Sequence, residues 1–514
     1  FEECTGVTYM NRTKKFMRNT VASVFQQAVV IIVGLILPRV MLVCYGSEIN
    51  GITSSIQQFI NYFTLVEAGI GASAIFALYK PLARQDHSRI SSIVTAARRF
   101  YIQSGYIFTG LIVILAFCFP LIRNTKTLSS PELSALVLVL GAPGFLNFFL
   151  LSKYNVILTA DQRSYVISIA KATFNAVSMV VIVYLAYLHF NVVLARALSL
   201  IALLVQSLII SIDVRKKYPY LDYHTKPDNS ALNQRWDALY LQILGIVQSG
   251  TPVILATIFL GYKDVSVYAI FNMVIGGLNG ILGIFTSGLS ASFGDVIARG
   301  QKEILQKTYQ EFEFTYYALI TVVYACAFVL IMPFIRIYTA GITDANYNVP
   351  LVGFLIVVNG FLYNLKTPQG MLVISAGLYH ETRWQTTMQG AIAVVGGIAL
   401  APSFGLPGIV IGSILSNLYR DIDLLFFIPK NVTKLPPQST LKRWVISALE
   451  FFLILLPATQ ITIRAEHISQ WILWGVTWSV YAVVVVVIFS LFLDRKVCKA
   501  SVKRIIKTLG VKNQ

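Results

Sequence analysis

Mostly apolar stretches of about 20 residues recur along the whole chain, and short polar segments separate them. A run of this length fits a helix that crosses a ~30 Å hydrocarbon core, whereas the strands of a membrane barrel alternate in polarity over about 10 residues. The pattern therefore predicts an all-α polytopic membrane protein with about 14 transmembrane helices. We place these helices at residues 20–43, 52–78, 100–122, 133–152, 165–188, 192–212, 237–260, 267–292, 314–335, 350–372, 385–403, 406–428, 444–463 and 471–493.

Composition agrees with the membrane class and offers no enzymatic motif. The 514 residues are 56% hydrophobic and 12% charged, about half the charged share of a soluble domain. The sequence has no GxxxxGK[ST], HExxH or GxSxG motif, and its five cysteines and five histidines are dispersed. We therefore expect a transporter and not an enzyme, with no metal and no cofactor. Its energy would come from an ion gradient (H⁺ or Na⁺), the membrane potential or substrate supply.

The basic residues indicate which side of the membrane each loop occupies. With the N-terminus inside, 31 of the 41 Lys and Arg lie in inside segments, seven lie at outside ends and loops, and three lie within helices. Cytoplasmic loops carry an excess of Lys and Arg. The net charge of +18 thus reflects topology and not nucleic-acid binding. An even helix count with both termini cytoplasmic is favoured, because the C-terminal tail is basic.

A faint internal repeat divides the chain. The segment from Tyr45 through AGIGASA to ALYKPLARQD resembles the segment from Tyr262 through SGLSASF to GDVIARGQ, about 215–219 residues later. Such repeats are typical of transporters with a substrate site between the halves. We interpret the first nine residues as foreign and Met10 as the natural start. The expected parts are a cytoplasmic segment 1–19, an N-lobe 20–214, a linker 215–236, a C-lobe 237–428, two further helices with a basic loop 429–493, and a cytoplasmic tail 494–514.

Three stretches resemble a known family. These are LPRVMLVCYGSEINGI (37–52), PFIRIYTAGITDANY (333–347) and GLPGIVIGSILSNLYRDID (405–423). In order and spacing they resemble the Wzx-type polysaccharide flippases of the multidrug/oligosaccharidyl-lipid/polysaccharide exporter (MOP) superfamily.

The resemblance implies two six-helix lobes around a cavity, with two C-terminal helices outside. It implies transport of an undecaprenyl-diphosphate-linked oligosaccharide to the outer leaflet of the bacterial plasma membrane by alternating access, for capsule, O-antigen or teichoic-acid assembly. Implied partners are that lipid, membrane lipids, and polysaccharide polymerase or export machinery, around a monomeric protein.

Ionisable and polar residues inside predicted helices are the candidate site residues, because burying a charge in lipid costs several kcal/mol. Glu67 ends a polar stripe that also holds Gln57 and Asn61, and it is the candidate for ion coupling. Neutralising a basic neighbour or reaching the cytoplasmic interface is the structural alternative for Glu67.

Basic residues within the helices would suit a diphosphate. Lys366, on one helical face with Asn359 and Tyr363, could attract it, as could Lys171. Both lysines could instead snorkel to the interface. Arg39, beside Pro38, could guide the head group or anchor in lipid phosphates. Arg420 lies beside Asp421 and Asp423, which favours a structural charge cluster.

Two other functions compete with the flippase. An ion-coupled multidrug or organic-cation antiporter of the same superfamily would need a cavity rich in acids and aromatics, and the mixed charges here leave that open. A membrane glycosyltransferase or polymerase is disfavoured because the longest loop, about 213–236, is too short to hold a catalytic domain.

Overall fold

The computed structural model describes the backbone at residues 2–67, 70–123, 125–223, 225–228, 235–286, 289–461 and 463–493. The expected basic tail 494–514 and linker residues 229–234 lie outside these ranges. The chain forms two compact units, Phe1–Ser266 and Val267–Gln514, which are described separately below. The boundary between them falls within one helix, α10 (Tyr262–Thr286).

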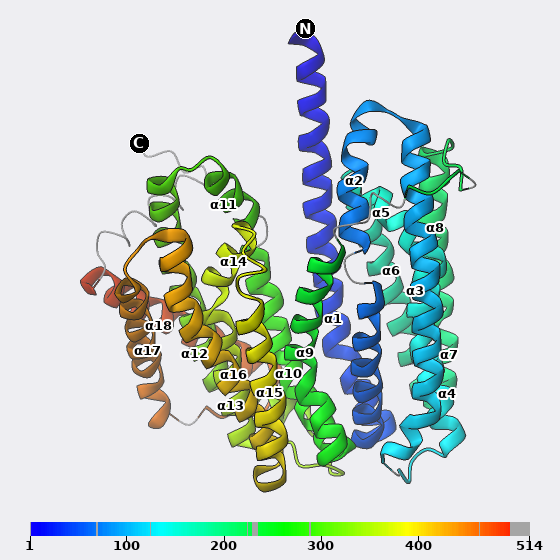
Figure 1. Ribbon diagram of the computed structural model, residues 1–514. Helices are drawn as coiled ribbons and strands as arrows, with labels where there is room; N and C mark the ends of the chain where they lie inside the picture. Colours follow the sequence, from blue (N-terminus) through cyan, green and yellow to red (C-terminus); the bar gives the residue numbers. More distant parts are fainter. Residues whose placement is uncertain are drawn as a thin grey trace. The chain divides into compact units, whose positions relative to one another are not determined.

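The first unit consists of helices that pack along one another (Figure 1). Its main pairs are α1 with α6, α3 with α4, and α6 with α8. Its elements before α10 are α1 (Glu2–Phe63), the 3-10 turn η1 (Thr64–Glu67), α2 (Ile70–Arg84), α3 (His87–Ile122), α4 (Ser130–Leu146), the π turn η2 (Asn147–Leu151), α5 (Ser152–Ala160), α6 (Ser164–Tyr187), α7 (Val192–Ser199), α8 (Ile201–Lys217) and α9 (Arg235–Phe259).

The second unit has a comparable series of helices and ends with a helical pair. Its main pairs are α15 with α16, α13 with α16, and α12 with α18. After α10 its elements are α11 (Leu289–Ala298), α12 (Lys302–Tyr338), α13 (Pro350–Leu365), α14 (Thr367–Ser375), α15 (Arg383–Phe404), α16 (Leu406–Ile428), η4 (Pro429–Thr433), α17 (Pro437–Leu455), η5 (Leu456–Thr459) and α18 (Ile468–Leu493).

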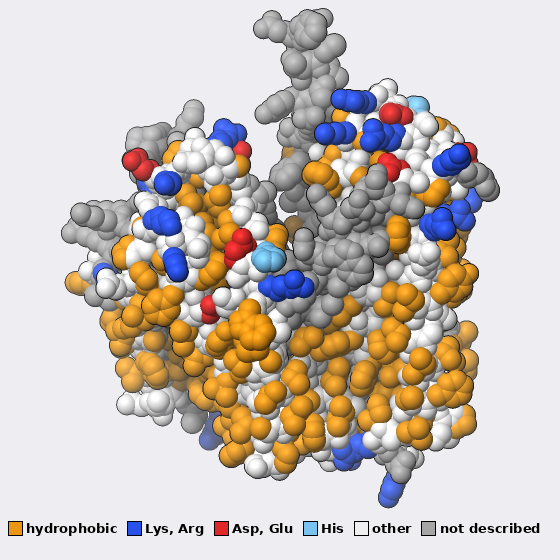
Figure 2. All heavy atoms as spheres, viewed as in Figure 1, with side chains coloured by type: hydrophobic (Ala, Val, Ile, Leu, Met, Phe, Trp, Pro, Cys, Tyr) orange, Lys and Arg blue, Asp and Glu red, His pale blue; other side chains and the backbone are white. Residues whose placement is uncertain are grey.

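The apolar runs of the sequence coincide largely with helices. Among the described residues, ten helical segments are long and apolar enough to cross a membrane, as expected of a multi-pass membrane protein. On the visible face, hydrophobic side chains cover the flank of each unit (Figure 2). The count of 14 spans and the placement of both termini stay predictions.

One range predicted as a single helix is interrupted in the structure. The range 52–78 was expected to be a single helix, but α1 ends at Phe63, a 3-10 turn covers Thr64–Glu67, and α2 begins at Ile70. The expected break before residue 52 is confirmed, because Gly46 has φ 84° and ψ 170° and interrupts α1. Glycine adopts this backbone conformation without a steric penalty.

The internal repeat of the sequence is visible as a repeated order of elements. A short helix, a residue with positive φ and a long helix follow one another in each unit: α2, Gln85 (φ 55°) and the 36-residue α3 in the first, and α11, Gly300 (φ 66°) and the 37-residue α12 in the second. The two turn residues are 215 residues apart in sequence. This spacing equals the lower end of the offset found in the sequence.

The start of the linker folds back onto the first unit. The Tyr218 hydroxyl donates to Asp161 at 2.6 Å, and the Ser92 hydroxyl donates to the Lys226 carbonyl at 2.6 Å. The rings of His87 and Tyr220 lie 3.8 Å apart. Burial, followed by the bond to Asp161, raises the pKa of Tyr218, so its hydroxyl stays a donor at neutral pH. The described residues 218–223 and 225–228 therefore belong structurally to the first unit.

Candidate functional site

A polar cavity of about 390 Å³ lies inside the first unit. It contains two of the three ionisable residues that the sequence singled out in this unit, Glu67 from η1 and Lys171 from α6. Amide and hydroxyl side chains make up most of the remaining polar lining: Gln26, Tyr101, Asn147, Asn155, Asn175 and Gln206. Six helices and two irregular turns contribute to the lining of the cavity, so it is a feature of tertiary packing.

Two departures from regular helix bring polar groups to this polar cavity. Glu67 is the last residue of the 3-10 turn that interrupts the apolar run after α1. Asn147 begins the π turn between α4 and α5, and π turns within helices are frequent at functional sites. Broken helices inside membranes are tolerated where the backbone is buried in protein or lines a water-filled cavity.

The polar cavity holds opposite charges that interact. The Lys171 ammonium exerts a favourable electrostatic effect on the Glu67 carboxylate, and Glu67 also acts on the Tyr101 hydroxyl. Glu67 and Lys171 do not form an ion pair with each other among the ion pairs of the described residues. An acid and a base that share a polar cavity without direct contact leave room for water, an ion or a polar ligand between them.

The remaining residues predicted for the first unit do not line this cavity. Gln57 and Asn61 are exposed neighbours on α1, with the Gln57 amide donating to the Asn61 side chain at 3.4 Å. Arg39 is half-buried on α1 after Pro38. Gln57 and Asn61 thus share one face of α1, as the predicted polar stripe requires. Glu67 does not continue this stripe, because α1 ends at Phe63.

In the second unit the predicted residues of α13 meet a polar side chain of α16. The Lys366 ammonium donates to Asn417 Oδ1 at 2.5 Å, and Asn417 Nδ2 donates to Asn359 Oδ1 at 2.9 Å. The ammonium also lies 4.8 Å from the ring centroid of Tyr363, a favourable cation–π distance. Lys366, Asn359 and Tyr363 therefore form one cluster around Asn417.

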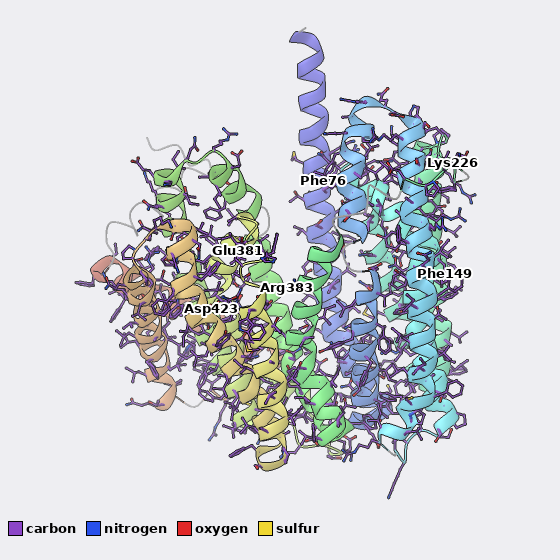
Figure 3. All side chains as sticks on the ribbon, viewed as in Figure 1. Phe76, Phe149, Lys226, Glu381, Arg383 and Asp423 are labelled. Atoms are coloured by element: carbon purple, nitrogen blue, oxygen red, sulfur yellow. The ribbon has the colours of Figure 1, made fainter. Side chains whose placement is uncertain are left out.

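A buried carboxylate accompanies the Lys366 cluster. Asp421 lies one turn after Asn417 and is 0% exposed, and neither of its carboxylate oxygens has a hydrogen-bond partner among the described residues. The positive charge of Lys366 acts on Asp421, but the two do not form an ion pair among those of the described residues. On the same helix Arg420 pairs with Asp423 at 2.6 Å; Asp423 is labelled in Figure 3. The structural charge cluster expected at Arg420 is thus present, and its ion pair joins Arg420 to Asp423.

A second buried ion pair fixes the C-terminal helices to α12. Arg443 of α17 pairs with Glu313 of α12, whose side chain is 1% exposed. The hydroxyls of Thr440 and Tyr309 donate to the same carboxylate at 2.8 and 2.9 Å. A buried ion pair is favourable only with such additional hydrogen bonds, so this contact specifies where α17 packs.

Glu450 lies in the same part of the second unit. Its side chain is buried, and with Arg443 and Ser447 it lines a cavity of about 20 Å³, enough for one water molecule. Glu450 thus shares this small cavity with the arginine that pairs with Glu313.

Sequence reasoning missed most of the polar cavity. Asn147, Asn155 and Gln206 are single amides within apolar runs, and neutral amides do not stand out in a search for charges. Asn147 had one available signal, because it follows Pro143 and Gly144, which disfavour regular helix.

No protein family model matches the sequence, and no curated protein matches it. Solved structures do resemble the fold. An inward-facing multidrug-resistance MATE family transporter of the MOP superfamily has a TM-score of 0.63 at 14% identity, over 80% of this chain and 95% of that chain. The lipid II flippase MurJ in an inward closed conformation has a TM-score of 0.62 at 14% identity, over 93% of this chain and 98% of that one.

A third neighbour is a MOP superfamily transporter from Pyrococcus furiosus, described by a reversed polarity of its binding pocket. It has a TM-score of 0.59 at 15% identity, over 82% of this chain and 97% of that chain. At these identities the likeness concerns the fold. The chain therefore has the fold found in MOP superfamily transporters, a superfamily that includes multidrug transporters and a lipid flippase.

Proposed function

We propose that this protein is a flippase for an undecaprenyl-diphosphate-linked oligosaccharide, carrying its head group from the inner to the outer leaflet of the bacterial plasma membrane. The extent of the structural likeness carries the proposal. MurJ, a lipid II flippase, aligns with 93% of this chain, whereas the inward-facing multidrug transporter aligns with 80%. The additional coverage is comparable in length with α17, α18 and their connections.

The charges of the two units support an anionic head group. Lys171 lines the polar cavity of the first unit, and Lys366 lies in the α13–α16 cluster of the second. An ammonium is a point charge suited to phosphate, and amides such as Asn147, Asn155 and Gln206 can hydrogen-bond sugar hydroxyls. We assign Lys171 and its cavity to the head group, with Arg39 and Lys366 as further cationic candidates.

Glu67 is the proposed coupling residue. Glu67 is the single acid among the described residues that line the polar cavity, and it shares the cavity with Lys171. It can take up a proton or a Na⁺ ion, and its charge state would change the attraction between these two groups. Such a change biases one conformation over another only if the ion binds the two with different affinity. Coupling by Glu67 therefore predicts an ion-dependent transport rate.

The second candidate is an ion-coupled antiporter of organic cations. The likeness to multidrug transporters favours it, as does the Glu67 carboxylate with Tyr101 nearby, since a carboxylate and an aromatic ring suit a cationic drug. The two functions predict opposite effects at Lys171. Removing its positive charge should weaken transport of a diphosphate and strengthen binding of an organic cation.

Depletion of the protein in its own host tests the flippase directly. Mass spectrometry should show accumulation of an undecaprenyl-diphosphate oligosaccharide, and wild-type protein should reverse it. Lys171→Ala should restore less than wild type, whereas the matched control Lys302→Ala, at an exposed position of the second unit, should restore fully. Unchanged lipid intermediates combined with increased sensitivity to cationic drugs would favour the antiporter.

A further inference from the structure

A second concave site lies where α2 turns into α3 in the first unit. The cavity measures about 520 Å³ and is separate in its lining from the polar cavity around Glu67. Three cations line it, Lys80 and Arg84 from the last turns of α2 and Arg89 from the first turn of α3. Most visible Lys and Arg side chains of this unit gather at the same end (Figure 2).

The three cations of this α2–α3 cavity have no acidic partner in the described part of the chain. None of Lys80, Arg84 and Arg89 takes part in an ion pair there. Two carboxylates share the lining. Asp86 caps α3, where its side chain accepts from the Arg89 backbone N–H at 3.0 Å, and Asp228 comes from the docked linker. The side-chain charges of the three cations are therefore available to an anion.

The internal repeat shows that this arrangement is specific to the first unit. At the 215-residue offset between Gln85 and Gly300, Lys80 corresponds to Asp295 and Arg84 to Arg299. Asp295 and Arg299 form an ion pair at 3.0 Å, so the second unit neutralises its arginine internally. Arg89 corresponds to Ile304. These positions are therefore cationic in the first unit, whereas in the second unit they hold an ion pair and an isoleucine.

Aromatic side chains complete the wall of the cavity. Phe76 and Tyr79 are 68% and 49% exposed and contact each other edge to face; Phe76 is labelled on α2 in Figure 3. Phe76, Lys80 and Arg84 follow at four-residue steps, so they share one face of α2. In the second unit the positions of Phe76 and Tyr79 are Ala291 and Gly294. Exposed tyrosines near basic residues are typical of the headgroup level of a membrane.

We propose that the α2–α3 cavity binds the phosphate of a membrane lipid, with Lys80, Arg84 and Arg89 as ligands and the lipid chain against Phe76 and Tyr79. Arginine suits phosphate because its guanidinium donates two parallel hydrogen bonds. The distribution of basic residues assigns this end to the cytoplasm, where anionic lipids attract such residues. The phosphate could belong to an anionic phospholipid or to a polyprenyl diphosphate, and both share this chemistry.

Lipid retention by the purified full-length protein tests the site. The protein is titrated in detergent micelles with dioleoyl phosphatidylglycerol, undecaprenyl diphosphate or phosphatidylcholine, and bound lipid is quantified by native mass spectrometry. The two anionic lipids should bind even when the micelles contain less than one lipid molecule per protein molecule. Phosphatidylcholine should not bind under the same conditions. Lys80→Asp places an acid four residues before Arg84, as Asp295 stands before Arg299, and reverses one charge. It should weaken anionic lipid binding about 25-fold, since each basic charge near an anionic surface contributes about fivefold.

Two further variants keep the outcome decisive. Arg84→Ala should weaken binding about fivefold, and Lys302→Asp, the same charge change at an exposed position of the second unit, should leave it unchanged. A unimodal size-exclusion peak establishes that each variant is folded. Stronger binding of undecaprenyl diphosphate than of phosphatidylglycerol identifies the diphosphate carrier as the ligand, and equal binding identifies the bulk phospholipid.

Equal lipid binding by wild type, Lys80→Asp and Lys302→Asp overturns the proposal. The assay measures binding at equilibrium and not transport. A protein that fails to flip any lipid therefore leaves this result unaffected, and the two proposals fail separately.

Discussion

The hydrogen bond from Lys366 to Asn417 makes a quantitative prediction about stability. The Lys366 ammonium donates to Asn417 Oδ1 at 2.5 Å and lies 4.8 Å from the ring centroid of Tyr363. Lys366→Met keeps most of the aliphatic volume and removes the charge. A hydrogen bond to a charged group contributes about 1.5–3 kcal/mol, and a cation–π contact contributes about 0.5–1 kcal/mol. We expect Lys366→Met to lower the free energy of unfolding by about 2–4 kcal/mol.

A double-mutant cycle separates this effect from a simple loss of packing. At about 1 °C per kcal/mol for a chain of 514 residues, Lys366→Met should lower the apparent Tm in detergent by about 2–4 °C, measured by intrinsic tryptophan fluorescence. Asn417→Ala removes the acceptor, so Lys366→Met should cost clearly less in the Asn417→Ala background than in the wild type. A Lys366→Met protein within about 1 kcal/mol of wild type, or a double variant as unstable as the sum of the singles, would refute this reasoning.

Three other predictions concern coupling and packing. Glu67→Gln should abolish the dependence of transport on a proton or Na⁺ gradient in reconstituted vesicles while leaving Tm within a few degrees; an unchanged ion dependence would remove Glu67 from the coupling role. Arg443→Ala should destabilise the protein by about 3–5 kcal/mol because it strands the buried Glu313 carboxylate, and thermal unfolding that matches wild type would contradict this. Gly412→Leu should prevent folding, because a Cβ atom at Gly412 would lie 2.5 Å from the backbone nitrogen of Gly397 in α15; size-exclusion chromatography checks this, with Gly276→Ala, whose Cβ meets nothing within 4 Å, as the tolerated control.

Much of the helical architecture could be predicted, because a membrane-spanning helix gives a simple hydropathy pattern in the sequence. An apolar run of about 20 residues has few stable alternatives to a helix in lipid. The interruption between Phe63 and Ile70 was missed for the same reason, since hydropathy continues through a broken helix unchanged. The repeat was readable because similar residue patterns recur about 215–219 positions apart, and the structure has turn residues with positive φ at the same spacing, Gln85 and Gly300.

Individual residues of the candidate site could be predicted, but their arrangement around one cavity could not. Glu67 and Lys171 stood out because charges are rare in apolar runs. Their meeting in one cavity depends on how α1, α3 and α6 pack, which no local pattern encodes. Asp421 shows the reverse case: its sequence neighbour Arg420 suggested a charge cluster, but Arg420 pairs with Asp423, and the cation that acts on Asp421 is Lys366, which follows α13.

Lipid translocation by the purified protein tests the proposed flippase function most directly. Proteoliposomes are prepared with a fluorescent undecaprenyl-diphosphate oligosaccharide in both leaflets, and a membrane-impermeant reductant quenches the outer label. The flippase account predicts that wild-type protein makes nearly all of the label accessible at a rate that falls with Lys171→Ala and not with Lys302→Ala. Half of the label staying protected in vesicles that contain folded wild-type protein, alongside gradient-driven uptake of an organic cation by the same vesicles, would contradict it.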